Sequence, residues 1–135
     1  MPFPDRRARV LVYFGALLPD LCFRALVMGL QSSIWFAEPV HSLWGAVLVS
    51  YACALLFESS LRRLAFFSIL TGYLTHLALD LAKDNLGAGA ILLFFPSMRL
   101  YEFGLYTPEQ SIDWIPWVMG IVLIFEWFRP SLLKR

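Results

Sequence analysis

Charged residues are scarce in this sequence. Asp, Glu, Lys and Arg make up 16% of its 135 residues, whereas a soluble globular domain carries roughly 25%. Apolar residues reach 59%, which is more than the core of one small domain can bury. These proportions exclude an ordinary soluble domain, and we expect residues 1–135 to form a single transmembrane domain.

Other signatures are missing as well. The net charge is +1 and no run is rich in Lys or Arg, so a nucleic-acid partner is excluded. Cys22 and Cys53 fall inside apolar segments, where they are expected to pack as small hydrophobic residues rather than form a disulfide. The first apolar run is too long for a signal peptide and lacks a small-residue cleavage site, so we expect a retained membrane anchor.

Four apolar runs have lengths suited to crossing about 30 Å of hydrocarbon, and each must be helical because lipid offers its backbone no water. The predicted spans are Val10–Leu30, His41–Phe57, Leu64–Leu81 and Ile112–Phe128. The predicted fold is therefore an all-α, integral membrane four-helix bundle with a long outer loop. Within that loop the run Gly89–Pro96 is too short to span, so we expect it to form an interfacial or re-entrant segment.

Basic residues predict how the bundle is oriented. In a four-pass arrangement most of the 11 Lys and Arg residues fall on the side of the two termini, whereas Lys83 and Arg99 fall on the other side. The positive-inside rule then places both termini in the cytoplasm. The residues on the side of the termini are Arg6, Arg7, Arg9, Arg62, Arg63, Arg129, Lys134 and Arg135.

Ionisable residues gather toward the outer half of the predicted bundle. An ionisable side chain at the centre of a span costs about 2.5–3.5 kcal/mol on insertion scales, so each one is expected to have a structural or functional role. Asp20 and Arg24 lie four residues apart on one face of the first helix. His76 and Asp80 have the same spacing on the third helix. The polar residues at the start of the second span are Glu38, His41 and Ser42.

These residues also have purely structural interpretations. Asp20 and Arg24 can form an intrahelical ion pair, and His76 and Asp80 can form a hydrogen-bonded packing pair. At 1.5 Å per residue, Asp20 lies about 15 Å from the end of a helix that continues to Leu30. Asp20 reaches the histidines only if that helix ends sooner or is kinked by the proline that precedes it.

Metal binding is the chemistry that suits this set best. Two imidazoles and two carboxylates form a ligand set suited to Zn²⁺, or to Mn²⁺ or Fe²⁺. The spacing of His76 and Asp80 puts both on one helix face, where Asp20 and His41 can complete the shell. A Ser–His–Asp triad has weaker support because no G-x-S-x-G elbow is present. The GAGA run at residues 87–90 lacks the lysine and the strand of a phosphate-binding loop.

Three motifs resemble the membrane-bound metal-dependent hydrolase family, small bacterial inner-membrane proteins typified by YdjM. They are GALLPD (Gly15–Asp20), HSLWG (His41–Gly45) and THLALDLAKDNLGAGAILLFFP (Thr75–Pro96), in the family's order. The resemblance implies a metal-dependent hydrolase in the bacterial cytoplasmic (inner) membrane. The family's histidine upstream of the Pro-Asp pair is absent and Cys22 replaces a second aspartate, which implies a reduced ligand set suited to a mononuclear or a degenerate site.

We therefore expect a hydrolase that holds one divalent metal, with zinc as the first choice. A metal-activated water would attack an ester or phosphodiester, with membrane lipid headgroups as the substrate class at this depth. Glu38 is assigned as general base, and Arg24 as the group that binds a phosphate or stabilises developing negative charge. The expected metal ligands are Asp20, His41, His76 and Asp80.

Two other classes of function stay open at this point. A non-catalytic membrane subunit or scaffold would use the polar residues for helix packing, in a homo-oligomer or with a membrane protein partner. A small transporter would use Asp20, His76 and Asp80 as a proton relay, which requires a continuous polar path across the bundle. Loss of assembly, rather than of a reaction, on replacing His76 would favour the scaffold.

Overall fold

The computed structural model describes residues 6–30, 38–84, 91–92 and 100–132 of the chain. The predicted all-α fold is confirmed, because α-helices account for nearly all regular structure in these residues. A short 3-10 turn precedes α3, and a two-residue antiparallel ladder joins β1 to β2. The elements are α1 (Arg6–Leu30), η1 (Glu38–His41), α3 (Leu43–Leu55), α4 (Ser59–Ala82), β1 (Ile91–Leu92), β2 (Leu100–Tyr101) and α5 (Pro108–Leu132).

Three of the helices, α1, α4 and α5, are long and apolar enough to cross a membrane. The fourth, α3, is a shorter apolar helix of 13 residues, which is about 20 Å against a hydrocarbon thickness of about 30 Å. It begins later than the predicted span because Ser42 caps it: the Ser42 hydroxyl accepts a hydrogen bond from the Gly45 N–H at 2.9 Å. His41 therefore precedes the helix instead of belonging to it.

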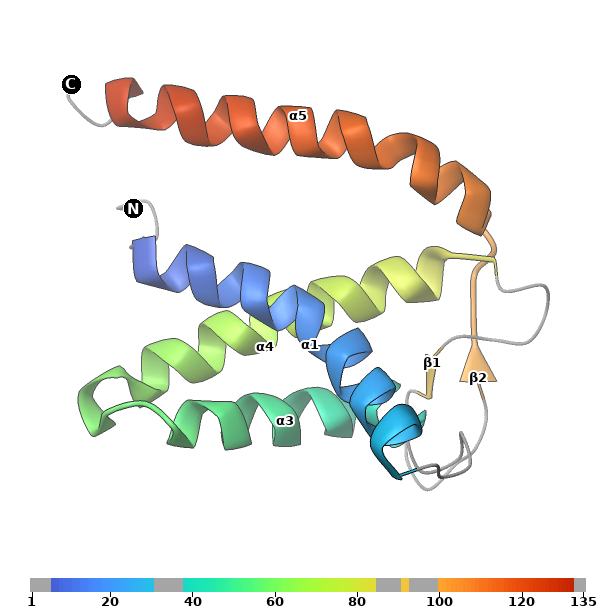
Figure 1. Ribbon diagram of the computed structural model, residues 1–135, viewed down its shortest axis with the longest axis horizontal. Coiled ribbons are helices and arrows are strands. Elements are labelled where there is room, and N and C mark those ends of the chain that lie inside the picture. Colours follow the sequence, from blue (N-terminus) through green and yellow to red (C-terminus); the bar gives the residue numbers. More distant parts are fainter. Residues whose placement is uncertain (1–5, 31–37, 85–90, 93–99, 133–135) are drawn as a thin grey trace.

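The helices run back and forth along one axis. Figure 1 shows that α1 begins and α5 ends at one end of the molecule, where the turn between α3 and α4 also lies. The end of α1, η1 and the β ladder lie at the other end. The chain therefore changes direction after each helix, with three helices long enough to span and the shorter α3 between two of them. The assignment of the first end to the cytoplasm stays a prediction from the basic residues.

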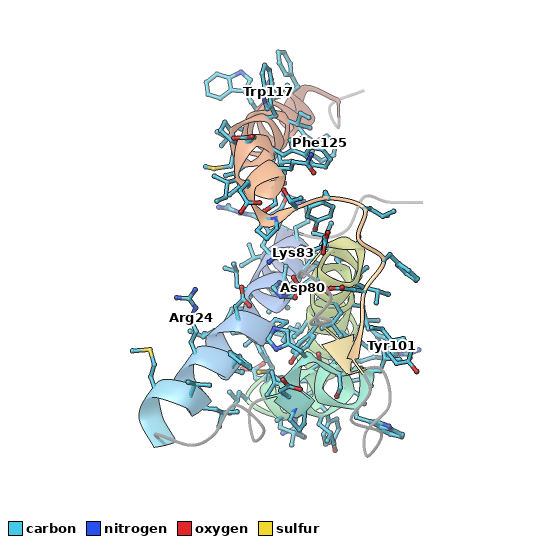
Figure 2. All side chains as sticks on the ribbon, turned by 90° about the vertical axis from the view of Figure 1, so that its right-hand side faces the viewer. Arg24, Asp80, Lys83, Tyr101, Trp117 and Phe125 are labelled. Atoms are coloured by element: carbon cyan, nitrogen blue, oxygen red, sulfur yellow. The ribbon has the colours of Figure 1, made fainter. Side chains whose placement is uncertain are left out.

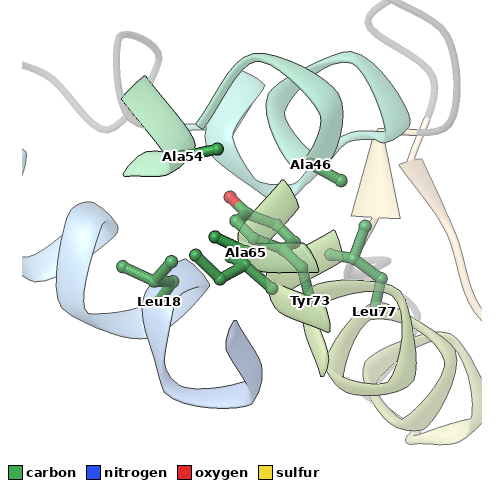
Figure 3. Close-up of a cluster of buried hydrophobic side chains, with 7 residues drawn as sticks. Leu18, Ala46, Ala54, Ala65, Tyr73 and Leu77 are labelled. Carbon is green, nitrogen blue, oxygen red and sulfur yellow. The ribbon is translucent and has the colours of Figure 1, made fainter. Parts of the chain in front are cut away.

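Helix α4 is the centre of the packing, since it lies against both α1 and α3. The buried cluster between the three helices combines three alanines, which let the backbones approach closely, with four larger side chains (Figure 3). Cys22 and Cys53 are free and pack against this cluster, as predicted. The buried cluster consists of Leu18, Ala46, Ala54, Ala65, Ile69, Tyr73 and Leu77.

The backbones of α1 and α4 touch where two glycines face them. A Cβ added at Gly15 would overlap the carbonyl of Ile69, and one added at Gly72 would overlap the carbonyl of Val12 and lie 2.7 Å from the Ala16 nitrogen. Only glycine fits both positions. Because Gly72 precedes His76 by one helical turn and Gly15 precedes Asp20 by five residues, this crossing sets how far apart these two side chains lie.

Helix α5 is set apart from the three packed helices in both Figure 1 and Figure 2. Nearly all of its described side chains are exposed, as expected of a helix that faces lipid. A two-pronged ion pair joins it to α1: the Arg9 guanidinium contacts the Glu126 carboxylate at 2.9 Å and 3.3 Å. The paired residues are 117 positions apart, so no local spacing in the sequence predicts this contact.

The chain before α5 closes the end of α4. The Phe103 and Leu105 N–H groups donate hydrogen bonds of 2.7 Å to the Leu81 and Ala82 carbonyls, which have no partner within the helix. The expected interfacial run Gly89–Pro96 lies outside the described residues, except for the two residues of β1.

Candidate metal centre

Three of the four predicted metal ligands, Asp20, His41 and His76, form one group between α1, η1 and α4, and the fourth, Asp80, approaches both histidines. The Asp20 carboxylate lies 3.5 Å from His41 Nε2 and 3.7 Å from His76 Nε2. The Asp80 carboxylate lies 2.9 Å from His76 Nε2 and 3.9 Å from His41 Nε2. Both Nε2 atoms therefore approach the same oxygen of Asp20 and the same oxygen of Asp80.

Asp20 reaches this point because α1 changes direction near Pro19. That proline is fully buried and lies inside a continuous helix, where it removes a backbone hydrogen bond, and Figure 1 shows the two halves of α1 running in different directions. No ion pair between Asp20 and Arg24 is found among the described residues. Arg24 is exposed on the flank of α1 and points away from Asp80 (Figure 2). The intrahelical pair considered from the sequence is thus absent.

His41 is positioned by hydrogen bonds to the short turn that carries it. The Tyr73 hydroxyl, from the buried face of α4, donates to the Val40 carbonyl at 2.8 Å. The Ser42 hydroxyl donates to the Pro39 carbonyl at 2.5 Å while capping α3. The edge of the Phe23 ring meets the His41 imidazole with centroids 5.2 Å apart. These contacts fix the turn on both sides of His41.

The orientation of His76 leaves Nε2 directed at the cluster. Its imidazole donates a hydrogen bond to the backbone carbonyl of Ala16 on α1. Nε2 is buried and has no hydrogen-bond partner, although Asp80 is only 2.9 Å away. With this contact to Ala16, the imidazole presents Nε2 to the two carboxylates. A second-shell bond to the non-ligating nitrogen is the usual arrangement for a metal-binding histidine.

The spacing of these atoms fits a divalent cation. Ligands bonded to zinc at about 2.0–2.1 Å in a tetrahedron lie roughly 3.4 Å from one another. Single ligand atoms of Asp20, His41 and His76 lie within 4.8 Å of one another, and the contacts of Asp20 to the histidines are 3.5 Å and 3.7 Å. The cluster can therefore hold a metal ion.

One side of the cluster is open and the other is closed. The side chains of His41 and His76 are 14% and 16% exposed, and that of Asp80 is 25% exposed. The side chain of Asp20 is 65% exposed. Asp20 is therefore the most accessible of the four residues, and the two histidines are the most enclosed.

Glu38, the predicted general base, begins the turn that ends with His41. Side chains three residues apart in a 3-10 turn lie nearly above one another, so Glu38 and His41 share one side of η1. Its catalytic role and the substrate-binding role of Arg24 stay predictions. Tyr73 and Gly72 were not predicted as part of the site, although they lie three and four residues before His76, within one helical turn.

Comparison with known proteins identifies a family. The model of the YdjM inner membrane protein family matches residues 2–134, which is nearly the whole chain. No curated protein and no solved structure matches the chain. The resemblance based on three short motifs is confirmed by this match.

Proposed function

We propose that this chain, which belongs to the YdjM inner membrane protein family, is a metal-dependent membrane hydrolase that cleaves a lipid-linked ester or phosphodiester at the outer side of the bilayer. One observation carries the proposal: Asp20, His41, His76 and Asp80 come from three separate segments, and each carboxylate approaches Nε2 of both histidines. A helix-packing pair of His76 and Asp80 would not require Asp20 and His41 from other segments.

The two histidines and two aspartates would hold one divalent ion, for which zinc suits the mixture of imidazole and carboxylate donors. When bound, such an ion lowers the pKa of a coordinated water enough to supply a nucleophile near neutral pH. The contact with the Ala16 carbonyl would orient His76 so that Nε2 faces the ion, and the hydrogen bond from Tyr73 would keep η1 in the position that presents His41.

The chain's own residues would guide the substrate and the protons. Entry from the exposed Asp20 side favours a substrate that arrives along the membrane surface, which suits a lipid headgroup. Glu38, on the same side of η1 as His41, is the candidate to accept the proton of the attacking water. Arg24 lies one turn beyond Asp20 on α1, where it can attract the phosphate of an approaching headgroup.

Hydrolysis in proteoliposomes tests the proposal. The protein, loaded with zinc, is reconstituted with phosphatidylglycerol, phosphatidylethanolamine and their monoacyl and phosphomonoester derivatives, and released headgroups and fatty acids are measured by mass spectrometry. We expect headgroups or fatty acids to be released, with a chelator abolishing the release and added zinc restoring it. The Asp20→Asn variant should lose at least 100-fold in rate, because it removes a ligand charge.

The matched control is Asp113→Asn, which removes a carboxylate from α5, outside the cluster. It should keep the parent rate. No chelator-sensitive release from any of these lipids, with zinc bound, would contradict the lipid hydrolase. If His76→Ala then weakened only self-association or a complex with another membrane protein, the scaffold function would replace it.

A further inference from the structure

An apolar groove lies at the end of the bundle opposite the His/Asp cluster. It has a volume of about 410 Å³ and lies between the beginning of α1 and the turn that joins α3 to α4. Its apolar wall is formed by Val10, Leu11, Phe57 and Leu61, among others. Twelve residues of α4 separate Leu64, which also lines the groove, from His76, a distance of about 18 Å along the helix. The groove is therefore a separate site.

Two arginines lie at the edge of this apolar groove. Arg6 and Arg7 line it from the first turn of α1, and both residues are exposed. The groove thus combines a hydrophobic wall with two positive charges at one end. This combination matches the two halves of an anionic phospholipid, whose acyl chain is apolar and whose phosphate forms strong charge-assisted hydrogen bonds with guanidinium groups.

We propose that this groove binds one anionic phospholipid of the cytoplasmic leaflet, with an acyl chain against Val10, Phe57 and Leu61 and the phosphate at Arg6 and Arg7. The positive-inside rule places this end of the bundle in the leaflet that is rich in anionic lipids. Basic pockets between transmembrane helices on that side are suited to lipid headgroups. The lipid would fill the gap between α1 and the α3–α4 turn and so support the helix crossing.

The turn itself is held by a different arginine. Arg62 donates a hydrogen bond from Nε to the Phe57 carbonyl at 3.1 Å, which keeps Phe57 in the wall of the groove. Arg63 lines a second groove, on another side of α1 and α4, together with Ala8 and Phe67. Arg63 therefore provides a charge at the same end of the bundle that does not border the first groove.

Lipid retention, measured by native mass spectrometry, tests the proposal. The full-length protein is taken from nanodiscs that contain equal amounts of dioleoyl phosphatidylglycerol and dioleoyl phosphatidylcholine, and the ratio of the two lipids still bound is recorded. The parent should retain phosphatidylglycerol preferentially. At about 1 kcal/mol for each basic residue near the surface, Arg6→Gln or Arg7→Gln should each lower that preference about fivefold, and the double variant about 25-fold.

Two further variants distinguish a built site from general attraction to positive charge. Leu61→Trp fills the groove without changing the charge, and should reduce bound phosphatidylglycerol to the level of the double variant. Arg63→Gln removes one charge at the same end, and should leave the preference within twofold of the parent. Far-ultraviolet circular dichroism confirms that each variant keeps its helices.

If Arg63→Gln and Arg6→Gln lowered the preference for phosphatidylglycerol equally, the proposal would be overturned, because the arginines would then act only through the net positive charge at this end of the bundle. No preference for phosphatidylglycerol in the parent would overturn it as well. If Leu61→Trp fails to fold, the comparison between Arg6→Gln and Arg63→Gln still decides the outcome.

Discussion

Replacing Gly72 by alanine tests whether the crossing of α1 and α4 holds the candidate metal centre together. The added methyl group would lie 2.7 Å from the Ala16 nitrogen and 2.9 Å from the Val12 carbonyl carbon. Ordinary contact distances begin near 3.5 Å, so the two helices must separate by about 1 Å. The neighbouring atoms are backbone, which cannot turn aside as a flexible side chain would. We expect a loss of about 2–3 kcal/mol in the free energy of unfolding.

The same displacement should weaken metal binding. The separation moves Asp20 on α1 away from His76 on α4, and also lengthens the hydrogen bond from His76 to the Ala16 carbonyl. Losing a second-shell partner typically costs 10–100-fold in metal affinity. We therefore expect Gly72→Ala to bind zinc about 10–100-fold more weakly in a competitive titration with a chromogenic chelator, and to unfold at a lower temperature in detergent.

The matched control is Gly29→Ala, which adds the same methyl group to α1 where nothing lies within 4 Å. Alanine favours a helix over glycine by about 1 kcal/mol, so this variant should be as stable as the parent or slightly more stable, with unchanged zinc affinity. If Gly72→Ala behaved in the same way as Gly29→Ala in both assays, the close crossing and its role in placing the ligands would be refuted.

Three further predictions follow from the hydrogen bonds, the ion pair and the topology. Tyr73→Phe leaves the Val40 carbonyl of η1 without its donor, so it should lower the free energy of unfolding by about 1–3 kcal/mol and weaken zinc binding. An unchanged free energy of unfolding and an unchanged zinc affinity would contradict the role of this hydrogen bond. A double-mutant cycle with Arg9→Gln and Glu126→Gln should give a coupling energy above about 1 kcal/mol in thermal unfolding, because lipid screens this ion pair less than water does. A coupling energy near zero would show that the ion pair does not hold α5 against α1. To test the orientation, single cysteines are introduced by Thr107→Cys or Ser59→Cys in a variant without native cysteines. A membrane-impermeant thiol reagent should label the first variant in intact cells and the second only after lysis. The reverse pattern would mean that the termini lie outside the cytoplasm.

Much of the fold could be predicted from hydropathy, since segments within lipid must satisfy their backbone hydrogen bonds internally. Three of the predicted spans lie within α1, α4 and α5, and each of these helices begins four or five residues earlier than the span. The second span was predicted too long, because the apolar run beginning at His41 gives no sign that Ser42 would cap the helix after a 3-10 turn. Hydropathy also could not show that α5 stands apart from the other helices.

The candidate centre was predictable as a set of residues but not as a geometry. Spacing placed His76 and Asp80 on one helix face, and the rarity of ionisable groups in spans singled out Asp20 and His41. Whether Asp20 paired with Arg24 or reached the histidines depended on the direction of α1 after Pro19, which one sequence does not determine. The hydrogen bond from Tyr73 joins residues 33 positions apart, and no local pattern predicts such a pair.

Metal content is the most direct test of the account. The protein is purified in detergent, incubated with zinc, passed over a desalting column and measured by inductively coupled plasma mass spectrometry beside His76→Ala, Asp80→Ala and the control Asp113→Asn. The account predicts about one zinc per chain in the parent and the control, and a loss of zinc with retained helicity in the other two variants. A parent that binds no divalent metal after reconstitution, or histidine and aspartate variants that keep a full complement, would contradict it.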